Sequence, residues 1–151
     1  MPQRVRRRAL LQSTAVGIVG LAGCTTFGDQ STSQTPKFID LTAINLHDAP
    51  HTAHVRLELD GETVYRESKR IAASGPDETH GAVFSEYPTT AEPYVLSAWL
   101  DDRPGADAGT LDFASFDTEC LAVQLMIGTY GRNVETPRLA IYYGFNCSAS
   151  S

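Results

Sequence analysis

A short stretch of strict alternation, followed by a two-residue turn signal, constrains the fold of this chain most. Residues 54–59 place their apolar side chains on one face of a strand, namely Val55, Leu57 and Leu59. Asp60-Gly61 follows, and this dipeptide is a strong hairpin signal. Thr63 to Arg66 continues beyond the turn. The pattern predicts an antiparallel hairpin with one buried face and one solvated face.

The rest of the chain continues as short strands and breaks, without a helical period. We expect further strands at residues 38–47, 82–86, 93–100, 110–116, 121–130 and 138–146. The sequence therefore predicts an all-β protein: a single antiparallel β-sandwich of about seven strands, immunoglobulin-like or related. This domain covers residues 38–147, and residues 148–151 form a short tail. Trp99 precedes Cys120 and Cys147, so the immunoglobulin order Cys–Trp–Cys does not occur.

The first 23 residues have the pattern of an export signal. Four arginines lie within the first eight residues, without an acidic residue, and a short apolar stretch with three glycines follows at 13–23. A spanning helix needs roughly 20 apolar residues, about twice this stretch, so we expect cleavage of the segment. A group of four residues resembles the motif of twin-arginine signals, which implies recognition by that export pathway: Arg7, Arg8, Leu10 and Leu11.

Residues 21–24, Leu-Ala-Gly-Cys, resemble the lipobox of lipoproteins at all four positions. The resemblance implies cleavage before Cys24 and a lipid on its sulfur, which holds the mature chain on the outer face of the cytoplasmic membrane. Two long acyl chains anchor a protein stably, because each buried methylene contributes about 0.8 kcal/mol. Residues 24–37 are rich in Ser, Thr and Gln, and we expect the lipidated N-terminus to continue as a flexible linker.

The net charge of the mature chain limits the classes of partner that it can bind. The whole chain has 12 basic and 18 acidic residues; four arginines leave with the signal, so the balance becomes 8 − 18 = −10. A chain of this charge without a basic patch should bind neither nucleic acid nor an anionic membrane surface through electrostatics. With its signal, its lipobox, Asp60-Gly61 and the 45–55 segment, the chain resembles surface lipoproteins of salt-loving archaea that contain small immunoglobulin-like sandwich domains. That resemblance implies no particular activity.

Cys120 and Cys147 remain as a pair once Cys24 is assigned to the lipid. An exported protein meets an oxidising exterior, where disulfides persist. Opposed residues of an antiparallel hairpin have numbers with a constant sum, and this pair gives 267, with its midpoint in the polar turn 131–137. With the same sum, Ala122 opposes Phe145, Gln124 opposes Tyr143 and Met126 opposes Ile141 on one face of the hairpin. On the other face, Val123 opposes Gly144 and Leu125 opposes Tyr142. We expect a structural disulfide that closes the open end of this hairpin.

Two clusters contain residue types that ligate metals. Three histidines have spacings of four and three, and imidazole is the commonest metal ligand: His47, His51 and His54. Pro50 argues against the helix on which these spacings would share a face. Asp101 and Asp102 begin an acidic, Gly-containing loop with oxygen ligands of the kind that calcium prefers, but the loop lacks the EF-hand spacing. These five residues are the candidates for a metal site. If the two segments are instead solvated turns, the sequence predicts no metal and no cofactor.

Motifs for hydrolysis do not occur in the sequence, which has no Gly-x-Ser-x-Gly, no His-Glu-x-x-His and no Gly-rich phosphate loop. The leading hypothesis is therefore a lipid-anchored, non-catalytic surface module that binds a partner or ligand, or has a structural role in the envelope. One alternative is a solute- or metal-binding lipoprotein that serves a membrane transporter. Another is a small hydrolase.

Overall fold

Alternating apolar and polar side chains produce eight strands in the part of the chain that the computed structural model describes, residues 33–105, 108–129 and 134–148. The strands are β1 Lys37–Asn45, β2 His51–Leu59, β3 Glu62–Ile71, β4 His80–Val83, β5 Val95–Leu100, β6 Gly109–Asp112, β7 Cys120–Ile127 and β8 Leu139–Gly144. One short 3-10 helix, η1 (Phe113–Ser115), follows β6. No α-helix occurs in these residues, and the predicted all-β class is confirmed.

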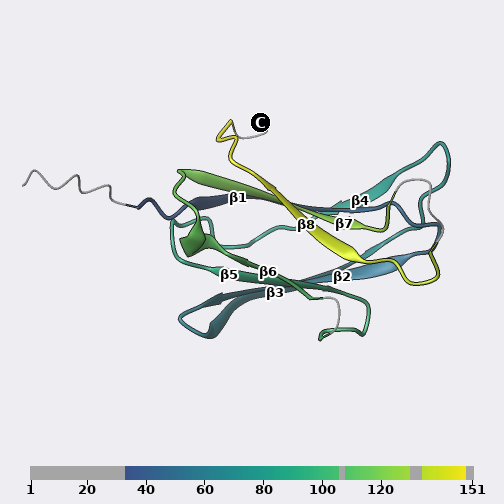
Figure 1. Cartoon of the computed structure of the whole chain (residues 1–151), viewed down its shortest axis with the longest axis horizontal. Coiled ribbons are helices and arrows are strands. Elements are labelled where there is room, and N and C mark those ends of the chain that lie inside the picture. The colour runs from purple at the N-terminus through teal and green to yellow at the C-terminus, as the bar shows by residue number, and fades with distance from the viewer. Residues whose placement is uncertain (1–32, 106–107, 130–133, 149–151) are drawn as a thin grey trace, which may run out of the picture. The chain divides into compact units, whose positions relative to one another are not determined.

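The strands form two four-stranded sheets that pack against each other (Figure 1). One sheet has the order β4-β1-β7-β8 and the other has the order β3-β2-β5-β6. Strands β1 and β7 run parallel, whereas the other neighbouring pairs are antiparallel. The predicted β-sandwich is therefore confirmed, and the eight observed strands agree with the expected number of about seven, but β1 and β7 form a parallel pair that the sequence pattern does not predict.

Inward-facing residues of both sheets form the core. In β2 the alternation is regular, with fully buried side chains at Ala53, Val55 and Leu57. In β7 the same period gives Leu121, Val123, Leu125 and Ile127. Phe38, Phe84 and Phe113 fill the space between the sheets. Leu59 belongs to the predicted buried face but is only partly buried, because it lies next to the turn at the rim of the core.

The Asp60-Gly61 turn joins β2 to β3 as predicted. Both residues have positive φ, 51° and 81°, which a type I′ turn requires. The hairpin pairs His51 with Ile71 at one limit and Leu59 with Glu62 at the other. It is longer than the sequence pattern indicates, because β2 begins at His51 rather than His54.

The last hairpin has the predicted partners but a different register. Cys120 and Cys147 form the expected disulfide, with their Cα atoms 5.5 Å apart. The expected constant sum of 267 is wrong, because Val123 opposes Tyr143 and Leu125 opposes Ile141, a sum of 266. A slip of one residue exchanges the faces of a strand, and only the observed register turns Leu139 and Ile141 to the same side as the buried residues of β7. Strand β8 ends at Gly144, so the chain leaves the ladder before Cys147 and reaches Cys120 from outside it.

The two ends of the sandwich differ in composition. The proximal end is where the chain enters β1: the Lys37 N–H donates to the carbonyl of Glu119, and the disulfide lies beside this point. The distal end is where β1, β5 and β7 finish and β2 begins. It consists of residues 46–50, 72–79, 101–105, 128–129 and 134–138.

Candidate functional site

Buried polar side chains gather at the distal end. Among the described residues, the polar side chains in the most buried class are Asn45, His47 and His51. Buried polar groups are more informative than exposed apolar ones, because each must find a hydrogen-bond partner. This cluster is therefore the candidate functional site.

The two histidines form a continuous hydrogen-bonded chain with Asp101. Nδ1 of His47 lies 2.8 Å from Nε2 of His51, and Nδ1 of His51 lies 2.8 Å from Oδ2 of Asp101. At the other end, Nε2 of His47 lies 2.9 Å from the backbone carbonyl of Val134. This series of hydrogen bonds thus joins the β1–β2 loop, the start of β2, the residue after β5 and the β7–β8 loop.

The sheet register places Asp101 beside His51. Leu100 opposes Ala53 in the β2–β5 ladder, so the next residue of β5 meets Thr52. The Asp101 N–H donates to the Thr52 carbonyl, and the Thr52 N–H donates to Oδ1 of Asp101, both at 2.8 Å. Asp101 has a φ of +50°, a conformation that Asp tolerates better than most residues because its short side chain bonds locally.

Hydrogen bonding decides the ionisation of Asp101. Burial raises the pKa of this carboxyl, but the Thr52 N–H and the His51 ring, together with the charge of Arg103, outweigh burial and lower the pKa below its ordinary value. The carboxyl is therefore ionised near neutral pH and accepts hydrogen bonds without donating any.

The acceptors at the two ends limit which ring nitrogens of His47 and His51 can donate. The Val134 carbonyl and the Asp101 carboxylate are both acceptors, so the three hydrogen bonds of the chain need three protons, all carried by the two imidazoles. Two neutral imidazole rings have only two N–H protons, so one of the three contacts would lack a donor proton. Two imidazolium rings hold four and direct two N–H groups at each other. All three contacts are hydrogen bonds together only when the two rings hold three N–H protons between them.

Asn45 connects the same loops through a second set of bonds. Its amide nitrogen donates to the carbonyls of Ala49 and Ala72, and its amide oxygen accepts from the N–H of His47. Ser74 extends this set, because its hydroxyl donates to the Asn45 carbonyl and accepts from the N–H of His80. Asn45 belongs to no motif in the sequence. Its signal is positional: Leu41, Ala43 and Asn45 share the inward face of β1.

The five predicted metal-site candidates separate in the structure. His47, His51 and Asp101 come together, but His54 lies on the opposite face of β2, because positions 51 and 54 differ by an odd number. There its ring stacks on Trp99 with centroids 5.2 Å apart, and its Nδ1 bonds to the Ser68 hydroxyl. Asp102 lines a hollow that also includes His54, Trp99 and Asp101.

The geometry around the histidine pair suits hydrogen bonding rather than metal coordination. Two nitrogens bound tetrahedrally to one metal at about 2.0–2.1 Å lie more than roughly 3 Å apart, whereas Nδ1 of His47 and Nε2 of His51 are separated by 2.8 Å. No group of three His, Cys, Asp or Glu residues within the described ranges has a geometry that could hold a metal ion.

The order Asp101–His51–His47 resembles the acid–base arm of a nucleophilic triad until its last contact. In a triad, the final imidazole nitrogen faces a hydroxyl or thiol that attacks the substrate. Here Nε2 of His47 faces the Val134 carbonyl, with a carboxylate oxygen of Asp48 at 3.4 Å. Neither oxygen has a proton to give to the imidazole. Within the described residues, the arrangement therefore holds loops together, and its last contact is a carbonyl rather than a hydroxyl or thiol.

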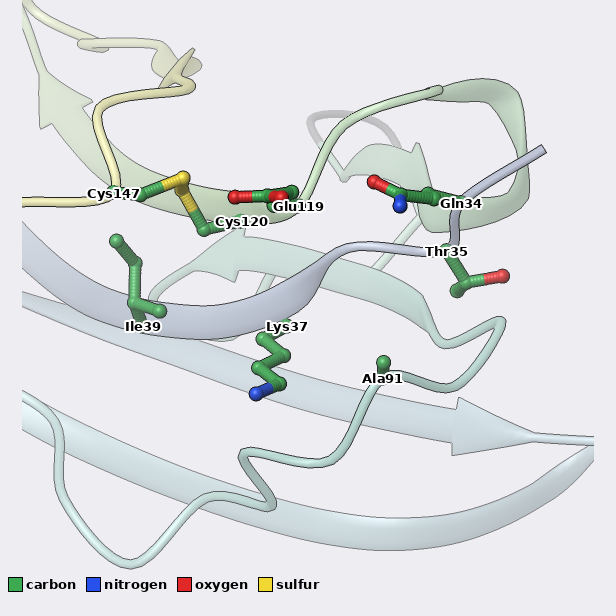
Figure 2. A pocket seen from close by; sticks show the side chains of 8 residues that line it. All are labelled: Gln34, Thr35, Lys37, Ile39, Ala91, Glu119, Cys120 and Cys147. Carbon is green, nitrogen blue, oxygen red and sulfur yellow. A yellow bond between two sulfur atoms is a disulfide. The ribbon is translucent and has the colours of Figure 1, made fainter. Parts of the chain in front are cut away.

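A hollow of about 650 Å³ lies at the proximal end, next to the disulfide (Figure 2). Its lining consists of Gln34, Thr35, Lys37, Ile39, Ala91, Glu119, Cys120 and Cys147. Lys37 and Glu119 are the charged side chains of this lining. The hollow has the size of a small-ligand site but contains no pair of carboxylates and no histidine.

Comparison with known proteins does not extend these findings: no protein-family model matches the sequence, and no curated protein matches it significantly. The export and anchor residues, Arg7, Arg8, Leu10, Leu11 and Cys24, lie outside the described residues. Within the described ranges, no helix is both long and apolar enough to cross a membrane.

Proposed function

We propose that this protein is a lipid-anchored module on the outer face of the cytoplasmic membrane, which presents the distal end of its sandwich to a partner and has no catalytic role. The observation that carries the proposal is the separation of the two ends. The chain enters the sandwich at Lys37, so an anchor at Cys24 would be attached through the proximal end. The distal loops lie at the opposite end of the sandwich and stay available to a partner.

The distal cluster supports a binding role for these loops. Loops clustered at one end of a sandwich are common binding surfaces. Here the His47–His51–Asp101 chain and Asn45 fix four loop segments to one another. Loops that are already ordered lose less conformational entropy when a partner binds. The termination of the histidine chain on a carbonyl supports a non-catalytic role.

Replacement of Cys24 tests the anchor. We expect Cys24→Ser to release the protein from membranes or to leave it unprocessed, because the lipid is the proposed attachment. The double variant Cys120→Ser/Cys147→Ser is the matched control: it removes two cysteines and keeps the lipobox, so it should stay with the membrane fraction. A Cys24→Ser protein that still pellets quantitatively after a carbonate wash contradicts the anchor.

A native mass spectrum of the mature protein tests the binding assignment. We expect the mass of the lipidated chain with one disulfide and no further adduct. A metal or small molecule that stays bound would favour the alternative of a solute- or metal-binding lipoprotein, with the hollow beside Cys147 as the first place to look.

A further inference from the structure

Strand β8 carries aromatic residues at positions that face inward but remain exposed. Leu139, Ile141 and Tyr143 alternate on the inner side of this edge strand. Leu139 is buried, whereas Tyr143 and, just beyond the strand, Phe145 are 50% and 49% exposed. The cause is the opposite sheet: β6 ends at Asp112, and only η1 and the residues after it continue across from β8 at the proximal end.

Phe116 joins these two residues in one aromatic patch. Its ring centroid lies 4.9 Å from that of Tyr143 and 5.5 Å from that of Phe145, and the last two are 5.7 Å apart. All three rings are tilted against one another, the arrangement that aromatic groups prefer. The patch, defined as Phe116, Tyr143 and Phe145, is therefore one apolar surface in which the partly buried Phe116 connects the core to the two exposed rings.

The chain approaches its first strand beside this patch. The N–H of Gln34 donates to the carboxylate of Asp117 at 2.8 Å, and the N–H of Thr118 bonds to the Gln34 carbonyl. Asp117 is the residue after Phe116. Twelve residues, 25–36, separate Cys24 from β1, and twelve residues span at most about 40 Å when fully extended. An anchor at Cys24 thus keeps the patch within this distance of the bilayer.

We propose that the aromatic patch is a membrane-contact surface, with the interfacial region of the lipid bilayer as its occupant. This inference rests on the proposed lipid anchor. Aromatic side chains, tyrosine in particular, favour the membrane–water interface, where the ring is apolar and the hydroxyl stays hydrated. The neighbouring charges are mainly negative, at Asp112, Asp117 and Glu119, with Lys37 as a cation nearby, so the contact depends on ring burial and not on attraction to anionic lipids.

Depth-dependent fluorescence quenching tests the contact. Trp99 is the only tryptophan, so Trp99→Phe provides a background for single reporters: Phe145→Trp in the patch and Val134→Trp at the distal end. The full-length, processed and lipidated variants are inserted into phosphatidylcholine vesicles that contain nitroxide-labelled lipid. We expect the patch reporter to shift to shorter wavelength and to lose most of its intensity. The distal reporter should keep its intensity.

The anchor and the contact fail in distinguishable ways. If the lipidated protein does not float with vesicles, the anchor itself is wrong. If it floats and both reporters keep their emission, the anchor stands and the membrane contact is overturned.

Two other occupants would also overturn the proposal, and the unlipidated Cys24→Ser chain in buffer identifies them. Sedimentation as a dimer that is abolished by Phe145→Ser would assign the patch to a second copy. A blue-shifted patch reporter that returns to longer wavelength with Phe27→Ala would assign it to the aromatic residue of the linker.

Hydrogen exchange of the unsubstituted protein gives a measurement that needs no variant. Attachment to vesicles should slow amide exchange in residues 113–118 and 142–146 and leave residues 134–138 unchanged. Equal protection at both ends, or none at the proximal end, contradicts the contact.

Discussion

The two ends of this sandwich are stabilised by different kinds of interaction. At the proximal end, the Cys120–Cys147 disulfide ties the segment after β8 to β7, and Phe116 packs against Tyr143 and Phe145. At the distal end, hydrogen bonds among Asn45, His47, His51 and Asp101 hold the loops. A covalent bond between sulfurs responds to reductant, whereas a cluster that contains the ionised Asp101 carboxylate responds to pH. The same fold therefore contains two regions whose stability depends on different solution variables.

Removal of the disulfide should have the largest effect. The bridge spans a sequence separation of 27, so it closes 27 − 1 = 26 intervening residues, and a loop of this length corresponds to about 3 kcal/mol in the unfolding free energy. We expect Cys120→Ala/Cys147→Ala to lower stability by about this amount in urea unfolding. Reduced wild-type protein is the control and should behave alike. Distal amide exchange that accelerates as strongly as proximal exchange at low denaturant would contradict the independence of the ends.

Asn45→Ala should have the next largest effect and should act on the distal end. The substitution leaves two part-buried carbonyls and the buried His47 N–H without their partner, each a loss of about 1 kcal/mol, or about 2–3 kcal/mol together. Thr42→Ala, at a half-buried position of the same strand, is the control and should cost far less. Thermal unfolding with the disulfide intact measures both variants, and equal losses would refute the assigned role of Asn45.

Asp101→Asn should change the pH dependence of stability. The pKa of Asp101 is lowered in the folded state, so the unfolded chain takes up this proton at a higher pH than the folded chain does. The stabilising contribution is thus present above the ordinary pKa of 3.8 and is lost as pH falls through the folded value. Urea unfolding between neutral pH and pH 3 should show a shallower acid loss for Asp101→Asn than for wild type. The exposed neighbour supplies the control, since Asp102→Asn should keep the wild-type slope.

The smallest effect is expected for Tyr65→Phe, away from the distal cluster. The Tyr65 hydroxyl donates to Glu67 and contacts the Ser85 carbonyl. A hydrogen bond from the Lys69 side chain, together with that from Tyr65, lowers the pKa of Glu67. The variant should therefore raise the Glu67 pKa, measured by carboxyl-carbon NMR, and should lower stability by about 1 kcal/mol. Tyr142→Phe removes an exposed hydroxyl and should do neither; an unchanged Glu67 titration in Tyr65→Phe would rule out the bond.

Local sequence patterns predict most strands and turns of the sandwich. They do not predict which distant strands pair or in which direction these strands run. Residues 54–59 with Asp60-Gly61 contain both their own period and their own turn, so the first hairpin follows from the sequence. The β1–β7 pair joins segments about eighty residues apart, and no local pattern encodes its parallel direction. In the last hairpin, the sequence predicts the two paired strands but not their register. The constant sum of 267 assumes that both cysteines lie in the β7–β8 ladder, but β8 ends at Gly144, before Cys147.

The distal cluster shows the same limit at the level of side chains. His47 and His51 are conspicuous in the sequence, but a spacing of four has no fixed geometry across a turn between strands. Asp101 becomes their partner only through the β2–β5 register, which aligns Leu100 with Ala53. His54, three residues after His51, is excluded by the period of two of a strand. Residue types therefore indicate the candidates, and strand pairing selects among them.

The parallel pairing of β1 with β7 has a mechanical consequence for an anchored protein. A pull transmitted through the linker enters the fold at Lys37 and is directed along β1. Because β1 lies between β4 and β7 and is bonded to β7 along its whole length, the force acts parallel to the strands and loads many hydrogen bonds at the same time. Extraction of β1 requires these bonds to break together instead of one after another. With the proposed anchor at Cys24, β1 would resist shear when a load is applied at the distal end.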